Sequence, residues 1–146
     1  MLSQTQPVET QPLSVKKGRV LNIVLWVLQV LLALAYLSAG YQKAFLPLDT
    51  VVKTIFWVSE VPTALVRFIG SVEILGGVGL ILPALLRIKP QLTVFAGLGL
   101  TTIMTLALIF HILHAEWVAL FPATVLLLLA GFVTYGRWKL AQITAR

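Results

Sequence analysis

The sequence predicts an all-α fold: a four-helix transmembrane bundle with a short interfacial helix between the first and second spans. Of the 146 residues, 59% are hydrophobic and only 11% are charged, whereas a typical soluble domain carries about 25% charged residues. Four long apolar stretches are separated by short segments rich in charged or polar residues and proline. This length holds four spans of about 20 residues and little else, so we expect one membrane domain.

The first element is a polar tail that leads into the first span. Residues 1–19 are rich in Gln, Thr, Ser and Lys, so we expect a flexible cytoplasmic tail that cannot bury enough apolar surface to order itself. Residues 20–42 contain no charged side chain, and a helix of this length rises about 34 Å. A basic start before an apolar stretch is also typical of a cleaved signal peptide, but the polar end at Ser38 and Gln42 favours a retained span.

The segment between the first two spans predicts a short helix. Apolar residues recur at helical spacing within residues 47–60, but the segment is too short to cross a bilayer. Trp57 near its end is typical of a residue at the membrane interface. We therefore expect a helix that lies in the interface or caps the bundle, with an ordinary loop helix as the alternative.

The other three spans follow with short connections. They are expected at about residues 62–83, 92–111 and 117–136. The second is interrupted by Arg67 and Glu73, and prolines and cations mark its exit. The membrane domain is thus assigned to residues 20–138, and residues 139–146 form a second cytoplasmic tail.

The charged residues are distributed unequally between the two ends of the expected bundle. With four spans, one face is flanked by the cations Lys16, Lys17, Arg19, Arg87, Lys89, Arg137, Lys139 and Arg146. The connections at the other face contribute only Lys43 and Lys53. Because cytoplasmic loops carry an excess of Lys and Arg, we expect both termini in the cytoplasm and the chain in a bacterial cytoplasmic (inner) membrane. Cations at helix ends meet lipid headgroups, so the net charge of +6 does not indicate a nucleic-acid partner.

Several kinds of chemistry have no support in the sequence. The chain contains no cysteine, which excludes disulfides, thiolate metal sites and dithiol redox couples of its own. His111, His114 and Glu116 offer two or three metal or haem ligands, but the paired Glu-x-x-His pattern of metal-binding bundles is missing, so we assign no metal site. No motif for flavin, haem or an iron-sulfur cluster is visible, so no cofactor is encoded by a motif of the chain.

Glu73 is the most informative candidate for function. It lies near the middle of the second span, where a carboxylate must be neutralised, paired or hydrated. Gly70 and Gly77 share its helical face, so a neighbouring helix or a ligand can approach closely. Arg67 is six residues away, about 120° around the helix. Lys43 or a histidine from another helix is therefore the better partner.

The other candidate residues gather at the outer end of the expected bundle. A polar group alone in lipid costs several kcal/mol, so we expect these groups to share one outward-facing cavity. This pocket would bind a ligand or handle protons, and its candidate residues are Glu73, Lys43, His111, His114, Arg67 and Tyr41. The alternative is a Lys43–Glu73 salt bridge that only fixes the bundle, with the histidines among headgroups.

Two motifs resemble the DoxX-like family of small membrane proteins. They are Ala39-Gly40-Tyr41-Gln42-Lys43 and Ile69-Gly70-Ser71-Val72-Glu73-Ile74-Leu75-Gly76-Gly77-Val78-Gly79-Leu80, which leads to Pro83. The segments 111–117 and 135–137 are also similar to that family. The resemblance implies a four-helix bundle with a Lys at the end of the first helix and a Glu in the second. One departure is Ala44, where relatives usually place a leucine.

The resemblance implies a membrane role without naming a reaction. The family's namesake is described as the small membrane subunit of a thiosulfate:quinone oxidoreductase. This resemblance implies a redox-associated subunit that binds a quinone-like ligand and takes electrons from a partner subunit. A eukaryotic relative is regarded as a receptor-assembly chaperone, which suggests instead an assembly factor for a client membrane protein. In that case Gly40, Gly70, Gly76 and Gly77 would serve helix packing. A small-solute carrier is the third hypothesis, and four short helices would need to form a homo-oligomer for that role.

Overall fold

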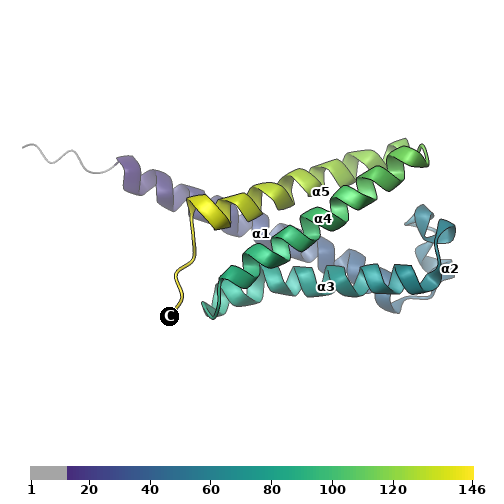
Figure 1. Cartoon of the computed structure of the whole chain (residues 1–146), viewed down its shortest axis with the longest axis horizontal. Coiled ribbons are helices and arrows are strands. Elements are labelled where there is room, and N and C mark those ends of the chain that lie inside the picture. Colours follow the sequence, from purple (N-terminus) through teal and green to yellow (C-terminus); the bar gives the residue numbers. More distant parts are fainter. Residues whose placement is uncertain (1–12) are drawn as a thin grey trace, which may run out of the picture.

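Four long helices dominate the computed structural model, which describes residues 13–146 of the chain (Figure 1). They are α1 (Leu13–Phe45), α3 (Thr63–Leu86), α4 (Gln91–Leu113) and α5 (Trp117–Tyr135). No strand occurs in the described residues. The predicted all-α fold is confirmed, and residues 1–12 of the expected tail lie outside the described part.

The outer surface of the bundle is apolar. All four long helices are long and apolar enough to cross a membrane. Large hydrophobic side chains face outward along them, including Val118 at 92% exposure and Leu113 and Phe121 at 76%. A soluble protein rarely leaves so much contiguous apolar surface uncovered. The chain is an integral membrane protein whose helices lie against lipid.

Most helix ends fall close to the predicted span boundaries. α1 is the exception, because it begins at Leu13, inside the segment assigned to the tail. α3 continues through Pro83 for three more residues, since a membrane helix tolerates a proline when neighbouring groups satisfy the freed carbonyl. It ends where Arg87 adopts a left-handed backbone with φ of 56°. After α5, the chain makes a π-helical turn, η2 (Gly136–Leu140).

The predicted short helix between the first two spans is confirmed, and it consists of a single α-helical turn with a 3-10 turn after it. α2 (Leu48–Val51) is followed by the 3-10 turn η1 (Phe56–Glu60). Residues 52–55 separate them, and the backbone of Ile55 at φ −126° and ψ 84° is not helical. Val51 and Val58 pack with Val66 in a small apolar cluster, so the segment covers the start of α3.

Each long helix packs mainly against the long helices that precede and follow it in the sequence. α1 lies along α3, α3 contacts α4, and α4 contacts α5, whereas α1 touches α5 less extensively. A central cluster is formed by Leu25, Leu32, Ala33, Tyr36, Leu80, Leu100, Met104 and Val133. α1 and α3 therefore form the helix pair with the most extensive contact, and the candidate site lies between them.

Candidate functional site

Glu73 and Lys43 form an ion pair inside the bundle. Glu73 lies on the buried face of α3 together with Val66, Gly70, Gly77 and Leu80. The Lys43 ammonium at the end of α1 donates to Glu73 Oε1 at 2.6 Å, and the two side chains are only 7% and 2% exposed. Each charge would be costly alone in an apolar interior, so the pair neutralises both where α1 meets α3.

Two facing glycines bring the helices close enough for this pair. A Cβ added at Gly70 would lie 2.7 Å from the Ala44 backbone nitrogen and 2.8 Å from the Gly40 carbonyl oxygen. A Cβ at Gly40 would lie 2.7 Å from the Gly70 carbonyl oxygen. The backbones of α1 and α3 are therefore in contact here, as in other membrane helix pairs with small residues at the interface.

One oxygen of the Glu73 carboxyl group has no hydrogen-bond partner among the described residues. Oε2 is buried and has no hydrogen-bond partner within the described residues, and the same is true of the Tyr36 hydroxyl. Tyr36 is buried and lies two helical turns before Lys43 on the same face of α1. The site thus combines an ammonium, a free carboxyl oxygen and a free hydroxyl, which can exchange hydrogen bonds and protons with a bound polar group.

Arg67 and Tyr41 take different places around this pair. The Arg67 guanidinium donates to the Lys43 carbonyl oxygen at 2.9 Å and so holds the end of α1, without forming an ion pair with Glu73. Tyr41 is 55% exposed, and its ring lies 5.5 Å from that of Phe45. Arg67 therefore adjoins the site through the backbone, and Tyr41 lies on the outer surface of α1.

The histidines form a separate group. His111 Nδ1 lies 2.5 Å from Glu116 Oε2, and both side chains are largely buried. His114 is exposed and stacks on Phe110 with ring centroids 3.9 Å apart. The structure thus pairs His111 with Glu116 rather than with Glu73. In the part of the chain that the structure describes, no three His, Cys, Asp or Glu side chains are grouped to hold a metal ion.

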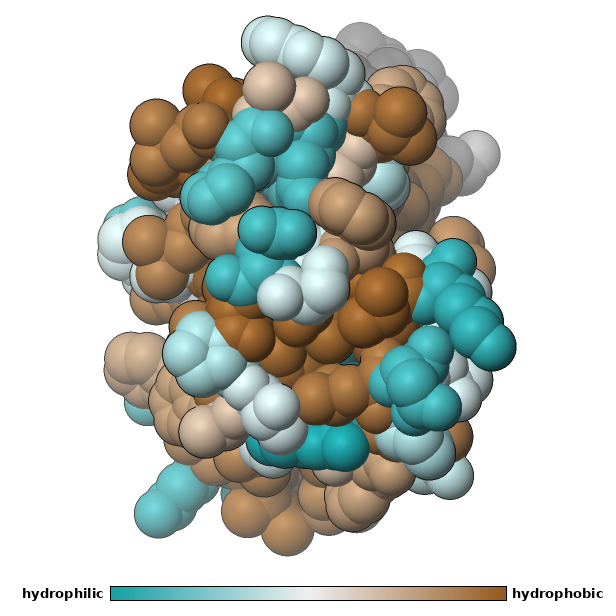
Figure 2. All heavy atoms as spheres, turned by 90° about the vertical axis from the view of Figure 1, so that its right-hand side faces the viewer, coloured by the Kyte–Doolittle hydropathy of each residue, from teal (hydrophilic) through white to brown (hydrophobic). Residues whose placement is uncertain are grey.

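Two aromatic rings connect the histidine group to the Lys43–Glu73 pair. The Lys43 ammonium lies 5.6 Å from the centre of the Trp57 ring, and Trp57 meets Phe110 edge-on with centroids 6.2 Å apart. Figure 2 looks onto this end of the bundle and shows separate hydrophilic groups around a central apolar area. The polar residues predicted to share one cavity therefore lie in two groups, and the Trp57–Phe110 contact lies between them.

Sequence reasoning missed a second buried polar cluster, at the opposite end of α1. Arg137 is only 3% exposed. It donates to Gln29 Oε1 at 2.8 Å and to Asn22 Oδ1 at 2.6 Å, and Gln29 donates to the Leu80 carbonyl oxygen. Arg137 lies in η2, directly after α5. It therefore joins η2 to α1, and through Gln29 to α3, in addition to its place among the cations at this end of the bundle.

A sequence signal for these residues does exist. Asn22, Gln29, Tyr36 and Lys43 follow one another at intervals of seven, which places them on one side of α1. Gln29, Tyr36 and Lys43 are buried. A polar residue every second turn of an otherwise apolar span marks the face that turns away from lipid.

A comparison with known families gives a match over most of the chain. The profile of the DoxX-like family matches residues 27–133, which is most of the chain. The matched range includes Lys43, Glu73 and the glycines between α1 and α3. No curated protein and no solved structure matches the chain.

Proposed function

The chain belongs to the DoxX-like family, and on that premise we propose that it is a redox-associated membrane subunit. In this proposal the Lys43–Glu73 pair binds the polar head of a quinone-like ligand, and apolar helix faces hold the ligand's tail. A partner subunit supplies the electrons. The chain's own residues bind the ligand head and move protons to and from it.

The observation that carries the proposal is the free Glu73 Oε2. Oε1 is occupied by Lys43 at 2.6 Å, whereas Oε2 is buried without a partner. A buried polar atom without a hydrogen bond is costly, and the unpartnered Tyr36 hydroxyl adds a second such atom. A hydroquinone hydroxyl can donate to Oε2, and a quinone carbonyl can accept from Tyr36. We expect the ligand to enter between α1 and α5, because these two helices touch each other less than the other neighbouring helices do.

The assembly-factor hypothesis finds less support in the packing. It requires the glycines of α3 to face a client helix, but a Cβ at Gly70 or Gly77 would meet α1, and one at Gly76 would meet Leu100 of α4. These surfaces are already used within the chain. We therefore favour the ligand-binding role.

Glu73→Gln is expected to weaken binding of a short-chain ubiquinol, the hydroquinone form, about tenfold, because the amide replaces the carboxylate oxygen that accepts a hydrogen bond from the ligand hydroxyl. Binding is followed by quenching of tryptophan fluorescence in detergent, since Trp57 lies beside Lys43. Tyr36→Phe keeps the ion pair and is expected to weaken binding about fivefold, so it tests the site even where Glu73→Gln unfolds.

Glu60→Gln is the matched control, because Glu60 is exposed and the substitution is chemically identical. Its affinity should equal that of the unmodified protein. Equal affinity in folded Glu73→Gln and Tyr36→Phe, or no quenching in the unmodified protein, would contradict the proposal. Thermal unfolding of each variant monitored by circular dichroism establishes that it is folded.

We also propose that the chain lies in a bacterial cytoplasmic membrane with both termini inside the cell. A fluorescent protein fused after Arg146 should fluoresce, because Arg87 and Lys89 line the same cavity as Arg146 and cytoplasmic ends are basic. Alkaline phosphatase at that position should be inactive, whereas insertion at residues 114–116 should give the reverse pattern. Phosphatase activity at the C-terminus would overturn this orientation.

A further inference from the structure

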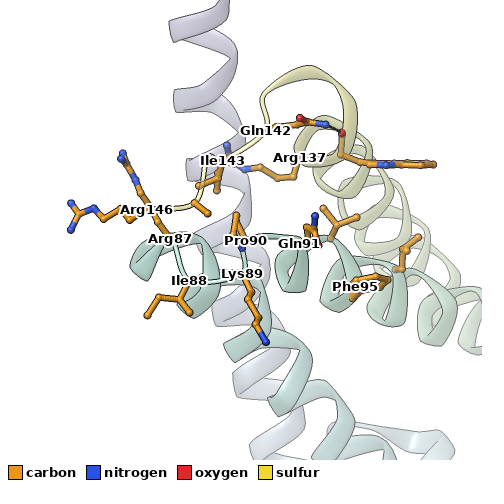
Figure 3. A pocket seen from close by; sticks show the side chains of 14 residues that line it. Arg87, Ile88, Lys89, Pro90, Gln91, Phe95, Arg137, Gln142, Ile143 and Arg146 are labelled. Carbon is orange, nitrogen blue, oxygen red and sulfur yellow. Dashed lines mark hydrogen bonds between the residues drawn. The ribbon is translucent and has the colours of Figure 1, made fainter.

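A large cavity lies at the end of the bundle away from Glu73. Its volume is about 910 Å³, and it is an open pocket lined by the α3–α4 connection, the first turns of α4 and the C-terminal segment (Figure 3). The Arg146 backbone N–H donates to the Arg87 carbonyl oxygen at 3.2 Å. This bond joins the C-terminal segment to the connection, so the two form one wall.

The wall of the cavity is strongly basic. Its lining includes Arg87, Lys89, Arg137 and Arg146, and no Asp or Glu. The membrane domain's acidic residues Asp49, Glu60, Glu73 and Glu116 lie on elements near the middle or the opposite end of the bundle. No side-chain carboxylate therefore lies among the residues that line the cavity, and the combined field of its four cationic side chains favours an anion.

The buried Arg137 guanidinium has one nitrogen atom without a hydrogen-bond partner among the described residues. Its Nε and Nη1 atoms are bonded to Gln29 and Asn22, while Nη2 is buried and has no partner within the described residues. A guanidinium matches the oxygens of a phosphate in geometry and charge. Arg137 is also held in place by its bonds to α1, so this donor is already oriented.

The connection between α3 and α4 holds its cations in an unusual backbone conformation. Arg87 and Lys89 have φ angles of 56° and 47°, a left-handed region that favours glycine over residues with a Cβ. Both residues line the cavity. The chain thus places two cations where the backbone alone would favour glycine, and such local strain is often found at functional sites.

The cavity continues onto an apolar surface. Phe95 and Leu98 of α4 line it and are 65% and 47% exposed. Figure 3 places Phe95 farther along α4 than the basic connection, in the direction in which the helix enters the membrane. A ligand with a charged head and a hydrocarbon tail would contact both surfaces at once, which a free phosphate ion would not.

We propose that this cavity binds the phosphate headgroup of an anionic phospholipid, with an acyl chain along Phe95 and Leu98. Arg137 and the two cations of the connection hold the phosphate oxygens. Basic pockets between transmembrane helices bind such headgroups in membrane proteins. This site is separate from the Lys43–Glu73 pair and does not depend on the role proposed for it.

The test is native mass spectrometry of the full chain in detergent, titrated with dioleoyl phosphatidylglycerol or dioleoyl phosphatidylcholine. We expect one tightly bound phosphatidylglycerol per chain, with about tenfold weaker binding of phosphatidylcholine. The double variant Arg87→Gln/Lys89→Gln should lower phosphatidylglycerol affinity about tenfold. Both residues are exposed, and thermal unfolding measures whether the fold is kept.

Arg19→Gln/Lys139→Gln is the charge-matched control, since both residues are exposed at the same end and neither lines the cavity. It should change the affinity by less than about twofold. Equal binding of the two lipids, or an equal loss in the control, would overturn the proposal in favour of general charge attraction. Displacement of phosphatidylglycerol by millimolar inorganic phosphate would identify a phosphate-ion site instead of a lipid site.

Discussion

Lys43→Met is expected to lower the free energy of unfolding by about 3–5 kcal/mol, because it leaves the Glu73 carboxylate buried without its partner. The two side chains are 7% and 2% exposed and 2.6 Å apart, so water cannot replace the lost ammonium. Methionine is an unbranched side chain that can replace the aliphatic stem of lysine, so lost packing contributes little. The measurement is reversible unfolding in mixed detergent micelles, followed by circular dichroism.

The double variant Lys43→Met/Glu73→Met separates the lost charge pair from other effects. Replacing a whole buried ion pair by apolar residues is often neutral or stabilising, so the double variant should be more stable than Lys43→Met alone. Lys53→Met is the matched control, because Lys53 is exposed, and it should stay within about 0.5 kcal/mol of the unmodified protein. A loss below about 1 kcal/mol in Lys43→Met would contradict a buried ion pair.

Gly70→Leu is expected to cost about 3 kcal/mol or more, because overpacking at this position forces two backbones apart. Even a Cβ would lie 2.7 Å from the Ala44 nitrogen and 2.8 Å from the Gly40 oxygen, and both are backbone atoms that cannot rotate away. The separation of α1 from α3 would also lengthen the 2.6 Å contact between Lys43 and Glu73. Unfolding in mixed micelles measures the loss, and disulfide crosslinking of cysteines introduced into α1 and α3 reports the helix separation.

Gly99→Leu is the control with the same change of side chain. A Cβ at Gly99 meets nothing within 4 Å, so the leucine should face lipid and cost nothing beyond small differences in helix propensity, where leucine is favoured over glycine. If Gly70→Leu and Gly99→Leu were equally stable, the close contact between α1 and α3 could not be correct.

Much of the fold is readable from local features of the sequence. Long apolar stretches interrupted by charged turns predict the four spans, since a bilayer requires about 20 apolar residues for each helix. The limits of the prediction appear where the local pattern is ambiguous. The apolar spacing within residues 47–60 suits one helix, but the structure forms α2 and η1 with a break at Ile55. Pro83 suggests an end to the second span, yet α3 continues to Leu86.

The candidate site was likewise predictable from the sequence only in part. Depth in the membrane identified Glu73 as a residue that needs a partner, and the position of Lys43 at a helix end made it a suitable one. The same reasoning placed His111 in their company, but Glu116 is only five residues away and pairs with it locally at 2.5 Å. Arg137 was interpreted by its charge alone, whereas it bonds residues 108 and 115 positions earlier in the chain.

The sequence by itself determined that this protein crosses the membrane four times and carries an acid that must be neutralised or paired. The physical reason is that the order of apolar and charged residues along the chain sets the hydropathy of each span and the depth of a charge within it. Only the tertiary structure decided which polar groups meet. Partners such as Lys43 and Glu73, or Gln29 and Arg137, lie on different helices, and their contact depends on how closely and at what rotation those helices pack. The basic cavity beside Arg87 likewise exists only because the C-terminal segment folds back against the α3–α4 connection.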